Sequence, residues 1–236
     1  MSYQNKFERR ELKFLLTPAQ YAAVRAAAER ECRPDAYPSS TVTSIYYDTP
    51  ESLLIRRSLE RPAYKEKLRV RVYGKPAADA VAYVEIKKKY DGVVYKRRVG
   101  LNAASAAAWL QGDVHRTGSQ IEREIEYFLS FYKNLRPAAL IACERDSFAG
   151  DGDFRLTFDK NIRFRRTDLR FSGGTRGEPL LAQGNVLMEA KAPGRLPQWL
   201  IDVLSENKIY KTSFSKYGAA YQKRLREANE GGFCYA

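Results

Sequence analysis

The sequence predicts an α+β fold in which an antiparallel β-barrel of about eight strands forms a charged tunnel and helices cover its outside. Short stretches along the whole chain alternate an apolar residue with a charged one, which is the period of a half-buried strand. Their charged positions are mostly Lys and Arg, and helical stretches able to cover the apolar faces lie between them. Apolar residues make up 44% of the chain, which is enough for a core.

The first predicted elements are a strand and a helix. Arg9, Glu11 and Lys13 alternate with Leu12 and Phe14, as in a strand with one charged face. A helix over 17–31 follows, because a threonine precedes a proline at its start and the run is rich in alanine.

The middle and the end of the chain continue the same mixture. A capping box of Ser119 and Glu122 begins one helix, and Asp91-Gly92 is a hairpin turn signal. The predicted strands are 41–48, 65–73, 81–89, 93–101, 138–148, 154–158 and 186–191. The predicted helices are 103–111, 119–133, 197–206 and 215–229, and a glycine-rich loop is expected at 171–184.

The charged faces of these strands are unusual in being so uniformly basic. Lys65, Lys67, Arg69 and Arg71 share one face of a strand. If several such strands pair, the face would repel itself unless a polyanion or its metal complex neutralises it. The alternative is an ordinary half-exposed sheet with solvated charges, but such a face would mix neutral polar residues and both charge signs.

The composition limits the classes of function. The 236 residues fit a single domain over 1–236, and the net charge of +13 indicates anionic partners such as nucleic acid, nucleotides, polyphosphate or an acidic membrane face. Cys32, Cys143 and Cys234 have no CxxC spacing, and His115 is the one histidine, so disulfides, a zinc site and a Ser-His-Asp triad are not expected. With a polar N-terminus and no apolar run of membrane-spanning length, we expect a soluble, cytoplasmic protein.

Eight short motifs, in this order, resemble the VTC branch of the triphosphate tunnel metalloenzyme (CYTH-like) superfamily, whose members include polyphosphate polymerase domains. The resemblance covers almost the whole chain, although no single motif is specific. The motifs are Arg9-Arg10-Glu11-Leu12-Lys13-Phe14, Ser44-Ile45-Tyr46-Tyr47-Asp48, Lys67-Leu68-Arg69-Val70-Arg71, Val84-Glu85-Ile86-Lys87, Tyr95-Lys96-Arg97-Arg98, Arg145-Asp146-Ser147-Phe148, Met188-Glu189-Ala190-Lys191 and Ser215-Lys216-Tyr217.

The resemblance implies an antiparallel tunnel that binds triphosphate through basic residues and a divalent metal through a glutamate. Glu189 and Glu11 are then the expected ligands of Mn²⁺ or Mg²⁺, and Glu85 is a further candidate for orienting cations. The expected substrate-binding residues are Lys13, Arg69, Arg71, Lys87, Lys96, Arg98, Arg145, Arg155, Lys191 and Lys216. Those expected to act in catalysis are Lys13, Arg69, Arg71, Lys87, Arg145, Arg155 and Lys216.

Several of these residues have a plainer interpretation. Arg145 and Arg155 could form rim salt bridges with Asp146 or Asp159, and Lys216 could be an ordinary exposed helix lysine. The tyrosines Tyr46, Tyr47, Tyr73 and Tyr83 are expected to pack on the sheet faces, although one of them could hold an adenine.

The expected function is a metal-dependent polyphosphate polymerase that transfers the γ-phosphate of ATP to a growing inorganic polyphosphate chain. Arg9 stands where hydrolytic tunnel enzymes carry their first acidic residue, which favours transfer to phosphate over transfer to water. One alternative is a tripolyphosphatase or nucleoside triphosphatase of the same fold. Another is a non-catalytic module that binds polyphosphate or nucleic acid. The expected partners are ATP and polyphosphate or triphosphate, without specific nucleic acid, and a membrane-associated partner would not be visible in the sequence.

Overall fold

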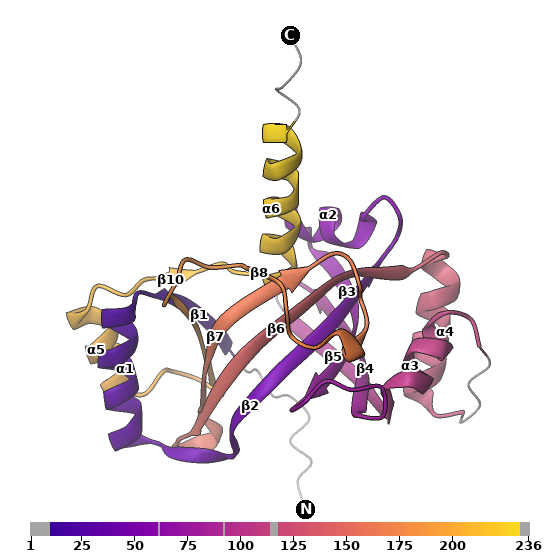
Figure 1. Cartoon of the computed structure of the whole chain (residues 1–236). Helices are drawn as coiled ribbons and strands as arrows, with labels where there is room; N and C mark the ends of the chain where they lie inside the picture. Colours follow the sequence, from indigo (N-terminus) through magenta and orange to yellow (C-terminus); the bar gives the residue numbers. More distant parts are fainter. Residues whose placement is uncertain (1–9, 61, 92, 114–117, 232–236) are drawn as a thin grey trace, which may run out of the picture. The chain divides into compact units, whose positions relative to one another are not determined.

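The computed structural model describes residues 10–60, 62–91, 93–113 and 118–231 (Figure 1). Expectations for Arg9, Gly92, His115 and Cys234 therefore lie outside the described residues. The chain divides into two compact units. Unit 1 contains the chain up to Thr41, Cys143–Ile162 and Leu181–Phe214, whereas unit 2 contains Val42–Ala142, Arg163–Leu180 and the chain from Ser215 onward. The expectation of a single domain over 1–236 stays a prediction.

The strands and helices alternate along the chain much as the sequence predicts. The strands are β1 (Arg10–Leu16), β2 (Arg33–Asp48), β3 (Tyr64–Tyr73), β4 (Val81–Tyr90), β5 (Val93–Asn102), β6 (Arg136–Ala149), β7 (Arg155–Arg165), β8 (Glu178–Pro179), β9 (Val186–Ala192) and β10 (Lys211–Thr212). The helices are α1 (Pro18–Glu31), α2 (Leu53–Leu59), α3 (Ala103–Leu110), α4 (Gln120–Tyr132), α5 (Gln198–Glu206) and α6 (Lys216–Gly231). None of these helices combines the length and apolar composition needed to cross a bilayer.

The α+β class and the antiparallel sheet are confirmed, and the word barrel describes this sheet only approximately. The strands form a 10-stranded sheet in the order β10-β1-β9-β7-β6-β2-β3-β4-β5, with β8 paired to β7. Among the described residues this order is a path with two ends, so the sheet has more strands than the expected eight or so and is not closed.

Several elements differ from the sequence-based expectation, among them β10, which was not expected, and β7, which continues to Arg165. Strand β2 begins at Arg33 instead of Thr41, because its first half is largely exposed and carries two prolines that hide the alternating pattern. Helix α2 was missed. It is only seven residues long, and the buried carboxylate of Asp48 accepts the backbone N–H groups of Leu54 and Ile55 at its start. The expected loop over 171–184 contains the short strand β8.

Unit 1 packs the helices α1 and α5 side by side against one face of its strands (Figure 1). Helix α1 begins with a capping box, in which Thr17 and Gln20 bond each other's backbone. The core of unit 1 contains Val24 of α1, Leu200 of α5 and Met188 of β9. The opposite face of these strands is therefore left for polar side chains.

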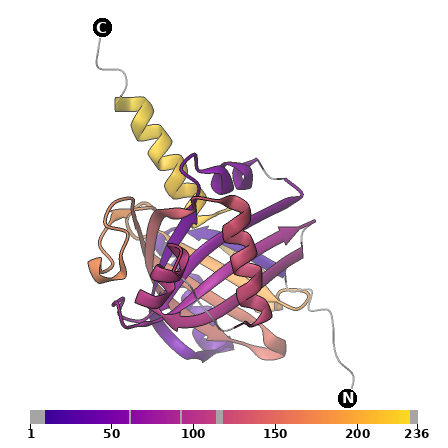
Figure 2. The ribbon, with the colours of Figure 1, turned by 90° about the vertical axis from the view of Figure 1, so that its right-hand side faces the viewer.

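Unit 2 packs α3 and α4 on one face of the β3–β4–β5 sheet (Figure 2). The predicted capping box of Ser119 and Glu122 begins α4. Leu68 and Val70 of β3 are almost completely buried under Ile125 of α4 and its neighbours. Burying the apolar face in this way turns the alternating charged residues toward the other face of the sheet.

Candidate functional site

The basic face of unit 2 is formed by alternate residues of three neighbouring strands. In β3, Leu68 and Val70 are buried, while Lys67, Arg69 and Arg71 between them are half-buried on the other face. The register continues this face into β4 and β5. It comprises Lys67, Arg69, Arg71, Glu85, Lys87, Lys96 and Arg98.

Three lysines stand in one row across the basic face. Lys67 pairs in register with Lys87, and Lys87 pairs with Lys96 on the next strand. Side chains directly opposite each other in adjacent strands are close enough to interact, and like charges there destabilise the sheet. A row of this kind is therefore expected where an anion regularly lies over the sheet.

Glu85 is the buried carboxylate at the centre of this face. It is 1% exposed, and its Oε2 lies 2.7 Å from Nε of Arg69 while its Oε1 lies 2.5 Å from Nζ of Lys96. Burial alone would raise the pKa of Glu85, but the charges of Arg69, Arg71 and Lys96 lower it to about 2. Glu85 is thus ionised under all ordinary conditions and fixes the two cations beside it.

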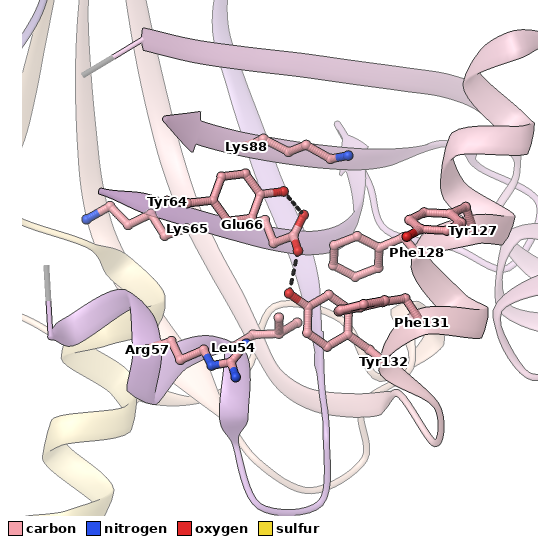
Figure 3. A pocket seen from close by; sticks show the side chains of 10 residues that line it. All are labelled: Leu54, Arg57, Tyr64, Lys65, Glu66, Lys88, Tyr127, Phe128, Phe131 and Tyr132. Atoms are coloured by element: carbon pink, nitrogen blue, oxygen red, sulfur yellow. Dashed lines mark hydrogen bonds between the residues drawn. The ribbon is translucent and has the colours of Figure 1, made fainter. Parts of the chain in front are cut away.

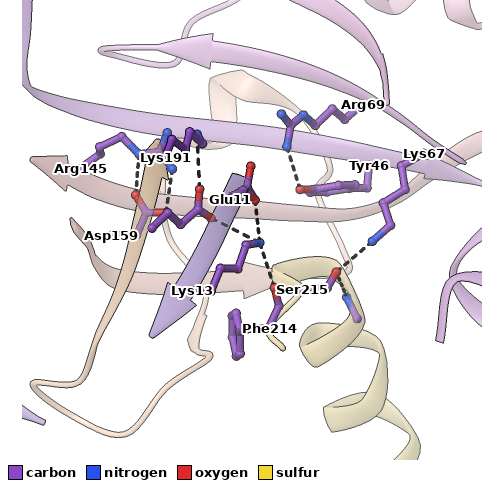
Figure 4. Close-up of polar contacts among 12 residues, drawn as sticks. Glu11, Lys13, Tyr46, Lys67, Arg69, Arg145, Asp159, Lys191, Phe214 and Ser215 are labelled. Atoms are coloured by element: carbon purple, nitrogen blue, oxygen red, sulfur yellow. Dashed lines mark hydrogen bonds and ion pairs between the residues drawn. The ribbon is translucent and has the colours of Figure 1, made fainter. Parts of the chain in front are cut away.

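Tyr46 of β2 lies next to Arg69, the partner of Glu85, on the same face of the sheet (Figure 4). Arg69 donates from Nη1 to the Tyr46 hydroxyl at 3.2 Å, and the Tyr46 ring stacks on Tyr217 with centroids 4.8 Å apart. The Tyr217 hydroxyl in turn donates to Asp48 at 2.8 Å. Burial would raise the pKa of Tyr46, but the cations Arg69, Arg71 and Lys67 lower it to about 8. Tyr46 is therefore a phenol that titrates close to neutral pH.

The other three tyrosines considered in the sequence, Tyr47, Tyr73 and Tyr83, divide between the buried face and the basic face of the sheet. Tyr47 packs in the core as expected. Tyr73 instead accepts a hydrogen bond from Arg71 at 3.4 Å, and Tyr83 lies under the guanidinium of Arg98, 4.9 Å from the ring centroid. These tyrosines support the arginines of the basic face.

The start of α6 adds a hydroxyl and a lysine to unit 2. Lys67 donates from Nζ to Oγ of Ser215 at 2.9 Å. The following residue, Lys216, is half-buried and does not fit the alternative of an ordinary exposed helix lysine. Its role in substrate binding stays a prediction.

Unit 1 has a smaller cluster on β1 and β9 (Figure 4). Lys13 pairs in register with Glu189, and its Nζ lies 3.5 Å from Oε1 of Glu189 and 3.4 Å from Oε1 of Glu11. The same Nζ donates to the carbonyl oxygen of Phe214 at 3.0 Å. Lys191 approaches the other oxygen of Glu189 at 3.7 Å. The structure thus brings together the four residues that the resemblance assigns to this part of the site.

Arg145 belongs to unit 1 and has a strong protein partner. Its Nε and Nη2 bind the two oxygens of Asp159 at 2.6 and 2.7 Å, and Asp159 is 0% exposed. Burial would lower the pKa of Arg145, but Asp159 raises it, so the guanidinium stays charged. The expected alternative of a salt bridge with Asp159 is therefore real. The third nitrogen of the Arg145 guanidinium, Nη1, takes no part in these two bonds.

Arg155 lies beside Lys191 but is more exposed than the other residues of unit 1 discussed above. Its side chain is 51% exposed, and its Nη1 lies 3.8 Å from Asp35. It pairs in register with Lys191, so it lies at the exposed end of the row formed with Glu11. Neither a hydrogen bond nor an ion pair joins Arg155 to Arg145 or Glu189 within the described part of the chain.

Two carboxylates of unit 1, Glu189 and Glu11, are the candidates for holding a divalent ion. Glu189 is 7% exposed, and its two oxygens face the ammonium groups of Lys13 and Lys191. No group of three or more acidic, histidine or cysteine side chains is arranged to hold a metal among the described residues. This donor set fits a hard ion such as Mg²⁺ or Mn²⁺, which takes one or two carboxylates and fills its other positions with phosphate oxygens and water.

The sequence identified Asp159 as a possible partner of Arg145, but it did not show that Tyr46 and Ser215 position candidate ligands. Tyr46, Ser215 and Asp159 hold Arg69, Lys67 and Arg145. The period-two pattern assigns Asp159 to the charged face of β7, but it does not say which strands supply the partners of Tyr46 and Ser215.

Comparisons with known proteins agree with this geometry. The family model of the VTC domain matches residues 8–224. The "Vacuolar transporter chaperone complex subunit 4" of Trypanosoma brucei brucei is 27% identical over 165 residues. That match covers 56% of this chain but only 21% of the relative, so the chain spans about a fifth of that protein.

Solved structures with the same fold are distant in sequence. A candidate adenylyl cyclase from Hippeastrum, described as having a dominant triphosphatase activity, has a TM-score of 0.57 at 14% identity and covers 90% of this chain and 95% of its own. A candidate adenylate cyclase from Bacillus halodurans has a TM-score of 0.55 at 13% identity, covering 87% and 92%. At such identities the likeness concerns the fold alone.

Proposed function

The chain belongs to the VTC domain family, and on this premise we propose that it is a metal-dependent polyphosphate polymerase. It transfers the γ-phosphate of ATP to the end of a growing inorganic polyphosphate chain. The row of Lys67, Lys87 and Lys96, three like charges in register beside the buried carboxylate of Glu85, supports binding of a phosphate chain. Membership of the VTC domain family supports the choice of polymerase over hydrolase. A cytoplasmic location, where ATP is available, is part of the proposal.

In the proposed complex, the basic face of unit 2 binds the triphosphate of ATP. Arg69 and Arg71 each present a planar fork that can bind two phosphate oxygens, which a lysine cannot do. Ser44 accepts from Nε of Arg71 at 3.0 Å, and Tyr46 with Glu85 holds Arg69, so both forks are oriented before substrate arrives. Lys87, Lys96, Arg98 and Lys216 complete the proposed set on this unit.

The cluster of unit 1 is proposed to hold the metal and further phosphate oxygens. Glu189 and Glu11 would bind Mn²⁺ or Mg²⁺. When bound, the ion neutralises charge on the phosphate oxygens. Lys13, Lys191, Arg145 and Arg155 are the proposed phosphate-binding residues of unit 1, of which Arg155 is the most exposed.

The proposed transfer needs positioning and cations, with little covalent chemistry from the protein. The attacking group is a phosphate chain end, which is already ionised near neutral pH, so a general base is not required. The contribution of the chain is then to hold donor and acceptor in line and to stabilise the charge of the transition state with fixed arginines and lysines.

Hydrolysis of tripolyphosphate or a nucleoside triphosphate is the second candidate. It is favoured by the two carboxylates, Glu11 and Glu189, that lie within 3.5 Å of the same lysine and could orient a water molecule. Both reactions would use the same basic face, so only the acceptor distinguishes them.

Product analysis separates the two candidates. Purified protein is incubated with ATP and Mn²⁺ or Mg²⁺, and the products are resolved on a gel and by phosphate release. We expect a ladder of phosphate polymers and ADP. Lys87→Gln should lose the ladder, whereas Arg97→Gln should keep it, since Arg97 lies on the opposite face of β5 and pairs with Glu124. Orthophosphate without polymer would support the hydrolase, and no turnover would contradict both.

A further inference from the structure

A pocket lies on the other face of the β3–β4 pair, the face opposite the basic one (Figure 3). It encloses about 300 Å³, the lower limit for pockets that bind small molecules. We refer to it as the aromatic pocket. Its lining residues come from α2, β3, β4 and α4, and those used here are Arg57, Glu66, Lys88, Tyr127, Phe131 and Tyr132.

Helix α4 supplies an exposed aromatic wall to the aromatic pocket. Tyr127 and Phe131 are 66% and 60% exposed, and their rings are stacked with centroids 6.1 Å apart. Phe131 also packs edge-on against Tyr132, at 5.0 Å. Two large exposed rings beside a cavity offer a flat surface on which another aromatic ring can stack.

The floor of the aromatic pocket is a buried carboxylate. Glu66 is 8% exposed and accepts hydrogen bonds from the hydroxyls of Tyr64, at 2.6 Å, and Tyr132. Burial and the Glu66 carboxylate raise the pKa of both phenols, so they remain donors. Because an ionised carboxylate has about four acceptor positions, two remain for N–H donors of a ligand.

Two cations line the same pocket. Lys88 is half-buried and stands directly opposite Glu66 in the β3–β4 register, and Arg57 of α2 is exposed at the other side of the pocket (Figure 3). Glu66 is bonded to the two tyrosines instead of to Lys88. Within the described part of the chain, neither Lys88 nor Arg57 forms a side-chain ion pair in the pocket. The pocket thus offers positive charge to an anion.

We infer that the aromatic pocket is a nucleotide-binding site. The base stacks on Tyr127 and Phe131, its amino N–H groups donate to Glu66, and its phosphate is bound by Lys88 and Arg57. This site lies on the face of the sheet opposite Lys87, so it is separate from the proposed triphosphate site and does not depend on the proposed function.

Titration calorimetry of the full chain with AMP tests the inference. Saturating tripolyphosphate is present, so that the basic face is occupied. We expect AMP to bind, and adenosine or inorganic phosphate alone to bind at least about tenfold more weakly. Lys88→Gln combined with Arg57→Gln should weaken AMP binding about tenfold or more, and so should Tyr127→Ala combined with Phe131→Ala.

Consecutive residues of β4 provide the matched control. Lys88→Gln should weaken AMP binding and leave tripolyphosphate binding unchanged, whereas Lys87→Gln should do the reverse. Lys88 is half-exposed, so its variant is expected to fold even if the double aromatic variant does not. The inference is overturned if millimolar AMP does not bind, or if Lys87→Gln abolishes AMP binding while Lys88→Gln does not. Loss of polymer synthesis with AMP binding intact would contradict only the proposed function.

Discussion

Arg69 and Glu85 are cross-strand neighbours in β3 and β4, and Nε of the arginine lies 2.7 Å from a carboxylate that is 1% exposed. One residue of the pair is a proposed phosphate ligand and the other is its support. Arg69 is therefore a poor choice for separating binding from stability, because removing it leaves a buried carboxylate with one fewer cation.

Replacing Glu85 is expected to destabilise the protein and to raise its dependence on anions. Glu85→Gln leaves Arg69 and Lys96 next to each other without the charge between them, which should cost about 2 to 4 kcal/mol. Thermal unfolding should occur about 5 to 10 °C lower, and tripolyphosphate should restore part of the loss. An unchanged unfolding temperature would mean that Glu85 does not hold the two cations.

Unfolding at acid pH should reveal the contribution of Glu85 to the free energy of unfolding. The pKa of Glu85 is lowered to about 2 in the folded protein, below its ordinary value of 4.5. Its contribution to stability is therefore complete above about pH 4.5 and is lost as the pH falls toward 2. The free energy of unfolding, measured by urea titration between pH 5 and 3, should fall less steeply in Glu85→Gln than in the unsubstituted protein.

Lys87, unlike Glu85, is expected to contribute to anion binding and little to the stability of the fold. It is half-buried and stands in register between Lys67 and Lys96, and Lys87→Met should change the free energy of unfolding by less than about 1 kcal/mol. The same change should weaken tripolyphosphate binding about tenfold. A variant that is both less stable and unchanged in affinity would contradict the assignment of this row to anion binding.

Tyr46 should make anion binding sensitive to mildly alkaline pH. Its pKa is lowered to about 8, so above that pH a phenolate forms beside Arg69 and competes with the bound anion. Tripolyphosphate affinity should be constant below pH 7.5 and fall between pH 8 and 9. In Tyr46→Phe this fall should be smaller, because Tyr73 and Lys96, whose pKa values are also lowered, remain to titrate on this face. The phenolate absorbance near 295 nm should lose its component that titrates near pH 8.

Asp159 is expected to act through Arg145. Asp159→Asn removes the charge of a fully buried bidentate partner, which should cost about 3 to 5 kcal/mol. The exposed ion pair of Asp35 with Arg155, at 3.8 Å, provides the control, since Asp35→Asn should change stability by less than about 1 kcal/mol. Equal losses in both variants would show that the Arg145 pair is not special.

The period-two pattern predicted the faces of the strands well, because one face of each strand must be buried. Leu68 and Val70 pack in the core of unit 2, and Lys67 and Arg69 lie on the other face, as the alternation indicates. The same pattern was absent from the first half of β2, where both prolines lie, so its start was placed too late.

Pairing partners could not be predicted, because register depends on which strands meet. The sequence identified Glu85 as charged, but it could not show that Arg69 and Lys96 approach it from both sides. For the same reason it did not indicate that the described sheet ends at β5 and β10 or that Arg155 lies near Asp35. Whether the clusters of the two units act on one substrate stays a prediction.

Calorimetric titration of tripolyphosphate into Lys87→Gln and Arg97→Gln, two variants that each remove one positive charge, tests the central claim most directly. The claim that the basic face binds triphosphate predicts at least a tenfold weaker affinity for Lys87→Gln and an unchanged affinity for Arg97→Gln. Equal weakening in the two variants would show that tripolyphosphate responds to net charge alone, and would contradict it.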